Sequence, residues 1–236
     1  MRLTVLGCEG PFPGAGGGTS GYLVEAGHQH ILLDAGSGTL AHMAAFCAPQ
    51  DLTGIVLSHL HYDHMAEVLL LGYALQGSGR KLPVYLPEGP DSVFSLIAAF
   101  PCFECHTIRP GVGFLLGDVA CLALPARHPV PAVGIRMAQR EHILCYSGDT
   151  NDLPDLGEAY RGASLLLVDG ALTEAQWGKA KPHLSAAMAA RLGLDAGARQ
   201  TVLTHFLPGQ RSVLMTEAWS VNPRCEGAIS LATYEF

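Results

Sequence analysis

The sequence is poor in charged residues and contains no long basic run. Charged side chains make up 15% of its 236 residues, and 21 acidic residues outnumber 14 basic ones, which gives a net charge of −7. The longest basic run is the pair Arg80-Lys81, so the chain lacks the positively charged surface with which proteins bind nucleic acid. We therefore expect no DNA partner, and an RNA partner is disfavoured.

The sequence also lacks a segment that would place it in a membrane. No stretch approaches the ~18 apolar residues that cross a bilayer, and the N-terminus has no cationic region followed by a long apolar run. Seven cysteines form an odd number at irregular spacing, which is typical of reduced thiols rather than a disulfide framework. These absences predict a cytoplasmic protein with no membrane partner.

Two patterns match cofactor motifs but lack the context that the cofactor requires. Residues 16–21 read G-x-G-x-x-G, yet a strand rather than a helix follows, so we predict no dinucleotide site. This loop is either a bare turn or a turn that contacts substrate. Cys102, Cys105 and His106 match C-x-x-C-H, the haem-attachment pattern, in a chain with no export signal. We expect a chance group in a loop, with a reversible disulfide or a metal site as alternatives.

Hydrophobic periodicity predicts strands and helices that alternate along the chain. The predicted strands are 2–6, 21–25, 31–34, 55–57, 84–86, 113–124, 132–147, 164–168, 201–203 and one near 228–233. The predicted helices are 38–47, 65–75, 91–100, 152–160, 185–194 and 213–219. Two halves of strands followed by helices, with no linker between them, indicate one α/β domain over 1–236, built as a four-layer αββα sandwich.

The segment that follows the predicted strand 55–57 is the most informative. It contains His59, His61, Asp63 and His64, four residues that bind metals, on a short turn between a strand and a helix. In an extended segment His59 and His61 project to the same side, because side chains alternate with a period of two. Asp63 and His64 belong to the turn into the helix and are free to face a second ion. The spacing therefore predicts a binuclear metal site.

This segment is the HxHxDH motif, on which the chain resembles the metallo-β-lactamase-fold hydrolases. In that family a distal histidine, a bridging aspartate and a final histidine, each at the end of a strand, complete the site. The resemblance assigns these positions to His128, to Asp149 in the segment Ser-Gly-Asp-Thr, and to His205. The pattern over 126–136 is similar to the RNase Z-like branch, which processes tRNA 3′ ends. The match covers nearly the whole chain, in the order that the family shows.

The resemblance implies two divalent ions that share Asp149. The implied ligands are His59, His61, His128 and Asp149 for one ion, and Asp63, His64, Asp149 and His205 for the other. Imidazole-rich sites suit zinc, with manganese or iron as alternatives. The oxygen-reducing di-iron relatives carry glutamate at the position of His61, so a histidine there favours hydrolysis. Two such ions would bridge a water and lower its pKa toward ~7, and Asp63 would orient the resulting hydroxide.

The same branch supplies a proton donor from a segment that resembles His-Leu/Ser-Ser/Thr-Ala, and residues 183–186 read HLSA. His183 is therefore the candidate general acid for the departing oxygen, and Ser185 the cap of the helix that follows. Asp169 ends a predicted strand, where the branch often has a carboxylate that would hold this imidazole protonated and oriented. The alternatives are an exposed loop histidine and a turn residue.

The neighbouring motifs favour a phosphodiesterase, whereas the spacing argues against tRNA. Canonical tRNA-processing members carry a long arm that grips tRNA, commonly between the segments that match His128 and Asp149. Only residues 129–148 separate the two here. With no arm and no basic patch, we expect a small phosphodiester, such as a cyclic nucleotide, that is cleaved by the metal-bridging hydroxide.

Three other functions stay open. An armless RNase Z-like ribonuclease would bind RNA with a salt-dependent affinity. A hydrolase of carboxylic esters, thioesters or lactones would use the same hydroxide without needing His183. A non-catalytic metal-binding protein would keep every ligand without turnover. The sequence does not determine the oligomeric state, although homodimers are common among relatives of this branch.

Overall fold

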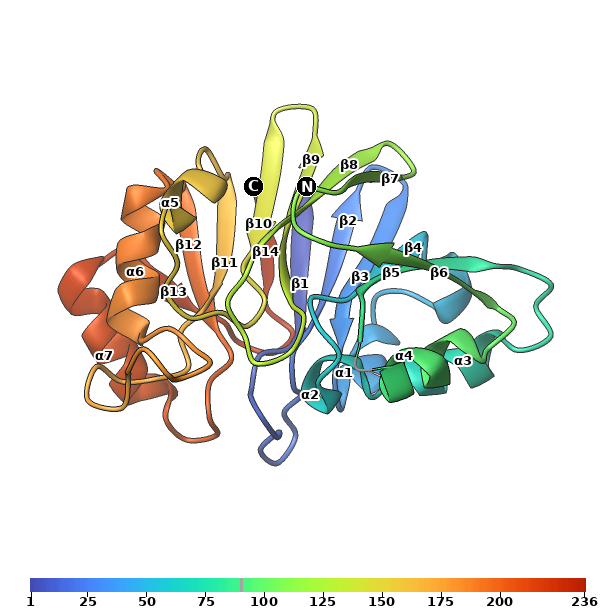
Figure 1. Ribbon diagram of the computed structural model, residues 1–236, viewed down its shortest axis with the longest axis horizontal. Coiled ribbons are helices and arrows are strands. Elements are labelled where there is room, and N and C mark those ends of the chain that lie inside the picture. Colours follow the sequence, from blue (N-terminus) through green and yellow to red (C-terminus); the bar gives the residue numbers. More distant parts are fainter. Residues whose placement is uncertain (90) are drawn as a thin grey trace.

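The computed structural model describes residues 1–89 and 91–236. Two seven-stranded sheets pack face to face, and helices cover the outer side of each (Figure 1). The strand order is β14-β1-β2-β3-β4-β5-β6 in the first sheet and β13-β12-β11-β10-β9-β8-β7 in the second. This arrangement is the four-layer αββα sandwich that the sequence predicts.

The strands of the first sheet are β1 (Arg2–Gly7), β2 (Gly21–Ala26), β3 (Gln29–Ala35), β4 (Gly54–Val56), β5 (Leu82–Pro87), β6 (Phe103–Ile108) and β14 (Thr233–Glu235). Those of the second are β7 (Gly113–Leu116), β8 (Val119–Pro125), β9 (Val133–Gln139), β10 (His142–Tyr146), β11 (Leu165–Asp169), β12 (Gln200–Thr204) and β13 (Glu226–Gly227). The predicted strand segments 113–124 and 132–147 each form a hairpin.

The helices lie in two groups, one on each outer flank (Figure 1). Beside the first sheet lie α1 (Thr39–Met43), α2 (Tyr62–Met65), α3 (Val68–Leu75) and α4 (Asp91–Ala98). Beside the second lie α5 (Leu156–Ala159), α6 (Ala186–Asp195) and α7 (Arg211–Val221). Within the described residues, no helix combines the length and the apolar character needed to cross a membrane.

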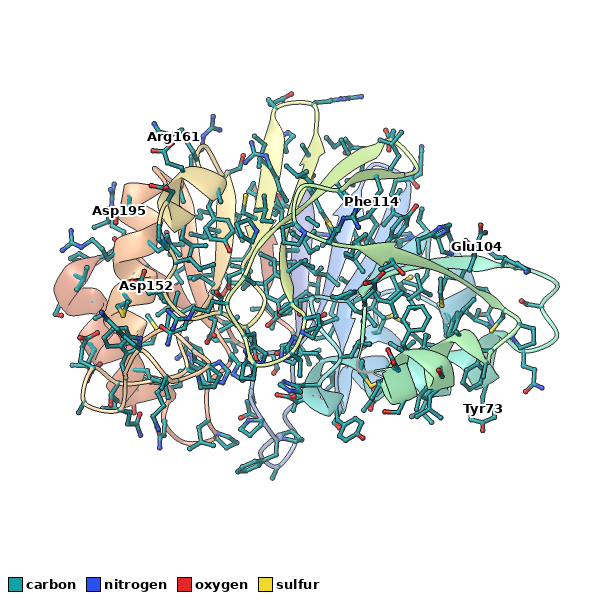
Figure 2. The ribbon with its side chains drawn as sticks, viewed as in Figure 1. Tyr73, Glu104, Phe114, Asp152, Arg161 and Asp195 are labelled. Atoms are coloured by element: carbon teal, nitrogen blue, oxygen red, sulfur yellow. The ribbon has the colours of Figure 1, made fainter. Side chains whose placement is uncertain are left out.

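Alternation along the strands builds two cores from the same sheet. Ile31 and Leu33 of β3 belong to the core that joins the two sheets, whereas Leu32 between them belongs to the core under α1, α3 and α4. Successive side chains of a strand point to opposite faces, so a sheet covered on both faces needs apolar residues at every position. Figure 2 shows side chains filling the space between the sheets.

Strand direction gathers the loops of both halves at one end of the sandwich. Strands β3, β4, β5 and β6 are mutually parallel, as are β10, β11, β12 and β13. Strand β8 runs in the direction of β10, because both are antiparallel to β9. The carboxyl ends of parallel strands meet at one edge, which is where open α/β sheets bind their ligands.

The predicted helix 65–75 is wrong as one element, because it breaks at Glu67. The N–H of Glu67 bonds to the carbonyl of Ala35 at 2.9 Å instead of continuing the helix. Its carboxylate accepts the N–H groups of Gly38 and Leu40, both at 2.6 Å, at the start of α1. Exposed N–H groups at a helix start favour an acidic partner, so a tertiary contact overrides the local helical pattern.

Three further expectations differ from the structure. The predicted helix 152–160 shrinks to α5, because Pro154 disfavours a helical conformation before it and Asp155 has a left-handed φ of 60°. The predicted strand 228–233 is instead the crossing between β13 and β14, which belong to different sheets. The C-x-x-C-H segment 102–106 overlaps the edge strand β6 and is not a loop.

The packing between the sheets predicts a large effect of core truncation. Leu33→Ala should lower the free energy of unfolding by about 2–5 kcal/mol, because the side chain is fully buried and leaves a cavity. Chemical denaturation measures this loss. Leu70→Ala is the matched control, since that side chain on α3 is 53% exposed. Equal losses in the two variants would contradict the assigned core.

Candidate metal centre

Every metal-binding residue predicted from the sequence lies near the end of a strand, at one edge of the sandwich. The segment 58–64 follows β4, and His128 follows β8. Asp149 follows β10, and His205 follows β12. Because these strands end at the same edge, side chains far apart in the sequence come within hydrogen-bonding distance of one another. Both sheets contribute to the cluster.

The segment 58–64 folds as the spacing suggests, with an extended part and then a helical turn. His61 has extended backbone angles and stands at the N-cap of α2, and its carbonyl accepts the N–H of His64 at 3.0 Å. His59 and His64 are fully buried. The turn therefore directs His59 and His61 toward one group of side chains and Asp63 and His64 toward another.

The first group consists of three imidazoles. Nδ1 of His61 lies 3.0 Å from Nε2 of His59 and 3.0 Å from Nε2 of His128. Burial is the main cause that lowers the pKa of all three, and it lowers that of His59 well below the usual range. Neutral imidazoles keep a free electron pair, which is the form that binds a metal.

The second group consists of Asp63, His64 and His205. Nε2 of His205 lies 3.2 Å from Oδ2 of Asp63, and Nε2 of His64 lies 3.8 Å from the same oxygen. Burial tends to raise the pKa of Asp63, but a hydrogen bond from His205 and the charge of His64 outweigh it, so the pKa is lowered. This carboxylate is therefore ionised and available as a ligand.

Asp149 stands between the two groups. Its Oδ2 lies 3.7 Å from Nε2 of His59 and 3.3 Å from Nε2 of His205, and its Oδ1 lies 3.3 Å from Nε2 of His64. Burial alone would raise the pKa of Asp149, but the charges of His205 and His64 hold it well below its usual range. One carboxylate thus faces residues of both groups.

The residues fit a bound divalent cation. Nε2 of His64 is buried and makes no hydrogen bond, although Oδ1 of Asp149 lies 3.3 Å away, whereas the other ring nitrogen is bonded to Asp34. A buried polar atom without a partner is destabilising unless something else ligates it. Ligand atoms of His59, His61 and His128 lie within 4.8 Å of one another, as do those of Asp63, His64 and His205. Imidazole and carboxylate are donors that zinc accepts.

His183 and Asp169 form a bonded pair beside this cluster. Nδ1 of His183 lies 2.8 Å from Oδ2 of Asp169, and the His183 ring stacks on the His205 ring with centroids 4.8 Å apart. Burial alone would lower the pKa of His183, but the Asp169 carboxylate outweighs it and the pKa rises to about 9. The imidazole is therefore protonated at neutral pH.

The surroundings of this pair fix its position. Asp169 is buried and accepts the N–H groups of Thr150 and Ala171, both at 3.1 Å. Ser185 caps α6 as the sequence predicts, because its Oγ accepts the N–H of Met188 at 3.1 Å. His183 also lies within 4.8 Å of ligand atoms of Asp149 and His205, a grouping that the sequence did not predict.

Sequence reasoning missed Asp34, which bonds to residues of α2, of β10 and of the turn after β4. Its Oδ1 accepts the Ser58 N–H at 2.7 Å. Its Oδ2 accepts the hydroxyls of Ser58 at 2.7 Å and Tyr146 at 2.8 Å, and lies 2.8 Å from Nδ1 of His64. Asp34 is the last residue but one of the buried strand β3, and Asp169 is the last of β11; this similar position is the signal that would have identified it.

Two of the site residues adopt backbone conformations that are rare for residues other than glycine. Asp34 has a φ of 56° and His205 a φ of 66°. Such residues are strained by about 1–3 kcal/mol each, and they cluster at functional sites. Close packing also restricts position 10, because a Cβ on Gly10 would lie 2.2 Å from the His205 ring. The ring is thus held between the chain at Gly10 and His183.

The bonding of Asp34 predicts its contribution to metal affinity. Asp34→Asn should weaken binding of a divalent ion by about 10–100-fold, because His64 loses the carboxylate that orients its ring. Titration of the metal-free protein with zinc measures the change. Asp118→Asn is the control, since that exposed carboxylate bonds only to Gln139 among the described residues. Equal affinities in the two variants would contradict the orienting role.

The comparisons with known proteins agree with this geometry. The family described as the beta-lactamase superfamily domain matches residues 29–206. A Bacillus subtilis protein named "probable metallo-hydrolase YhfI" is 30% identical over 87% of each chain. Its crystal structure superposes with a TM-score of 0.94, at 28% identity over 100% of this chain and 99% of that chain.

One further relative and one further solved structure carry the names of ribonucleases. A ribonuclease Z from Mycobacterium sp. is 28% identical over 95% of this chain and 92% of its own. The short form of human tRNase Z has the same fold, with a TM-score of 0.82 at 21% identity over 100% of this chain and 99% of that chain. The extent of the family match and the identity to YhfI together show that the chain belongs to the beta-lactamase superfamily, as a metallo-hydrolase.

Proposed function

We propose that the chain, acting as one domain over 1–236, is a binuclear metal-dependent phosphodiesterase for a small substrate such as a cyclic nucleotide. The observation that carries this proposal is the His183–Asp169 pair, bonded at 2.8 Å beside the imidazole and carboxylate cluster. A metallo-hydrolase needs a nucleophile from its metal centre. A proton donor at the opposite side of the reacting group is needed for a poor leaving group.

The metal ligands follow from the two groups of side chains. We assign His59, His61 and His128 to one ion, Asp63, His64 and His205 to the other, and Asp149 to both. Zinc suits this imidazole-rich set, with manganese or iron as alternatives. When bound, such ions lower the pKa of water and so make hydroxide available at neutral pH. Asp63, ionised and bonded to His205, would accept a hydrogen bond from that nucleophile and orient it.

His183 would serve as the general acid. Its Nδ1 is bonded to Asp169, so Nε2 is the nitrogen left to donate a proton to the departing oxygen. The alkoxide released from an alkyl phosphodiester is a strong base and leaves slowly unless it is protonated. Thioesters release a thiolate, which is a weaker base and has less need of such a donor, so the protonated His183 favours the phosphodiester over thioesters.

The connection between His128 and Asp149 supports a small substrate. Residues 129–148, all of them described, form a short loop and the β9–β10 hairpin of the second sheet, and no arm extends from them. Arg127, the basic residue next to His128 in the sequence, already donates to the backbone carbonyls of Asp152 and Lys179. With a net charge of −7, the chain offers little attraction for an RNA backbone. The ribonuclease relatives make an armless ribonuclease the second candidate.

Removal of His183 tests the proposal most directly. His183→Ala should retain its metal while kcat on a phosphodiester with an alkoxide leaving group falls by ~10²–10⁴. Turnover of 3′,5′-cyclic AMP by the zinc- or manganese-loaded protein measures this, beside a thioester, a lactone and a short single-stranded RNA. His142→Ala, at the start of β10, is the matched control.

Two outcomes would contradict the proposal. Activity on the acyl substrates alone would remove the phosphodiesterase function, and activity on RNA alone would favour the ribonuclease. Unchanged turnover of His183→Ala would remove His183 from the mechanism while leaving the substrate class in place.

The pKa of His183 predicts the alkaline limit of activity. The acid must be protonated, so kcat/KM should fall as pH rises through about 9. Asp169→Asn removes the charge that raises this pKa, so its profile should fall at lower pH. Rates measured from pH 6 to 10.5 give the alkaline limit of the wild-type protein and that of Asp169→Asn. Asp195→Asn is the control, because Asp195 is an exposed carboxylate on α6. An unshifted limit in Asp169→Asn would contradict the pairing.

A further inference from the structure

A pocket of about 150 Å³ opens beside the His183–His205 side of the metal centre. Both imidazoles line one of its walls, and the remaining walls come from the loop after β1, the segment after β11 and the loop before α7. The His183 ring stacks on His205, so the pocket borders the proposed acid and a metal ligand at once. Its function is not explained by the metal centre itself.

The position of the pocket assigns it to one part of the substrate. The general acid stands next to the oxygen that departs, so the group that carries this oxygen lies on the His183 side. In a cyclic nucleotide the departing oxygen belongs to the same nucleoside as the base. The pocket therefore lies where the nucleoside would extend from the phosphorus.

The composition of the walls favours an uncharged group over an anionic one. Pro11, Leu172 and Leu207 provide apolar surface. Apart from the two histidines, none of the lining residues, all of which are described, is charged. A second phosphate or a carboxylate would lose its hydration there and would meet no cation apart from His183, which is already paired with the Asp169 carboxylate. The pocket suits an uncharged group with flat apolar faces.

Two glutamines supply hydrogen-bonding groups at the pocket. Gln176 lines it, and its Oε1 accepts the N–H and the hydroxyl of Thr173 at 3.0 and 3.1 Å. This fixes the amide and leaves its NH₂ group for a ligand. Gln210, at the N-cap of α7, provides a second amide. Glutamine amides match the hydrogen-bonding edge of adenine in geometry.

We propose that this pocket is a subsite for the nucleobase, with Pro11, Leu172 and Leu207 against its faces and Gln176 and Gln210 at its edge. A pocket of about 150 Å³ suits a single ring system and is too small for a folded RNA. The subsite rests on the proposed function, since it defines the alcohol part of that substrate as a nucleoside.

Binding of a product and of its base-free counterpart tests the subsite. Calorimetric titration of the metal-loaded protein should give a Kd for adenosine 5′-monophosphate at least about tenfold lower than that for ribose 5-phosphate. Ala171→Phe, which fills the pocket, should remove this difference. Ala187→Phe is the matched control, because it places the same side chain in a cavity on the outer side of α6. It should keep the difference.

A second pair of variants keeps the test independent of pocket filling. Gln176→Leu and Gln210→Leu preserve bulk and remove the amides, and together they should reduce the advantage of the nucleotide by about tenfold. Equal affinities of the wild-type protein for the two ligands, or an advantage that survives Ala171→Phe, would overturn the subsite. If the wild-type protein binds the nucleotide more tightly than ribose 5-phosphate but does not turn over a phosphodiester, the proposed function alone is overturned.

Discussion

Burial of many ionisable groups at one edge is the constraint on which the rest of this structure depends. Transfer of a charge or an unbonded polar atom from water into a protein interior is strongly unfavourable unless partners compensate. Asp34 meets this requirement with four partners: the Ser58 N–H, the hydroxyls of Ser58 and Tyr146, and the His64 ring. It thereby ties the turn 58–64 to β3 of the first sheet and β10 of the second. The two sheets cannot separate without exposing that carboxylate.

The two sheets contribute different residues to the site. The first sheet supplies the HxHxDH turn, whereas the second supplies His128, Asp149, Asp169 and His205 at the ends of its own strands. The first sheet therefore provides three of the five imidazoles predicted to bind metal, and the second provides Asp149 and the candidate proton donor. Because each of the two groups of imidazole and carboxylate side chains includes residues of both sheets, the relative position of the sheets sets the geometry of the cluster.

The fold and the metal-binding segments could be predicted because their signals are local. Alternating apolar residues predicted the strands, the spacing of His59, His61, Asp63 and His64 predicted two groups of ligands, and Ser185 predicted the start of α6. Features that depend on contacts between residues far apart in the sequence could not be predicted in this way. The helix break at Glu67 depends on its bonds to residues near 35 to 40, and the role of Asp34 depends on Tyr146, which is 112 residues away in the sequence. The segment 102–106 joins the sheet only through its pairing with β5.

The absence of a side chain at position 10 limits how this site is able to diversify. The His205 ring occupies the space that a Cβ on Gly10 would need, and on its other side it stacks on His183. Larger residues at position 10 would displace the His205 ring, so substrate preference cannot be tuned there. Variation between paralogues with this architecture is therefore expected to concentrate at the more exposed positions 176 and 210. A new side chain there alters the pocket and leaves the imidazoles in place.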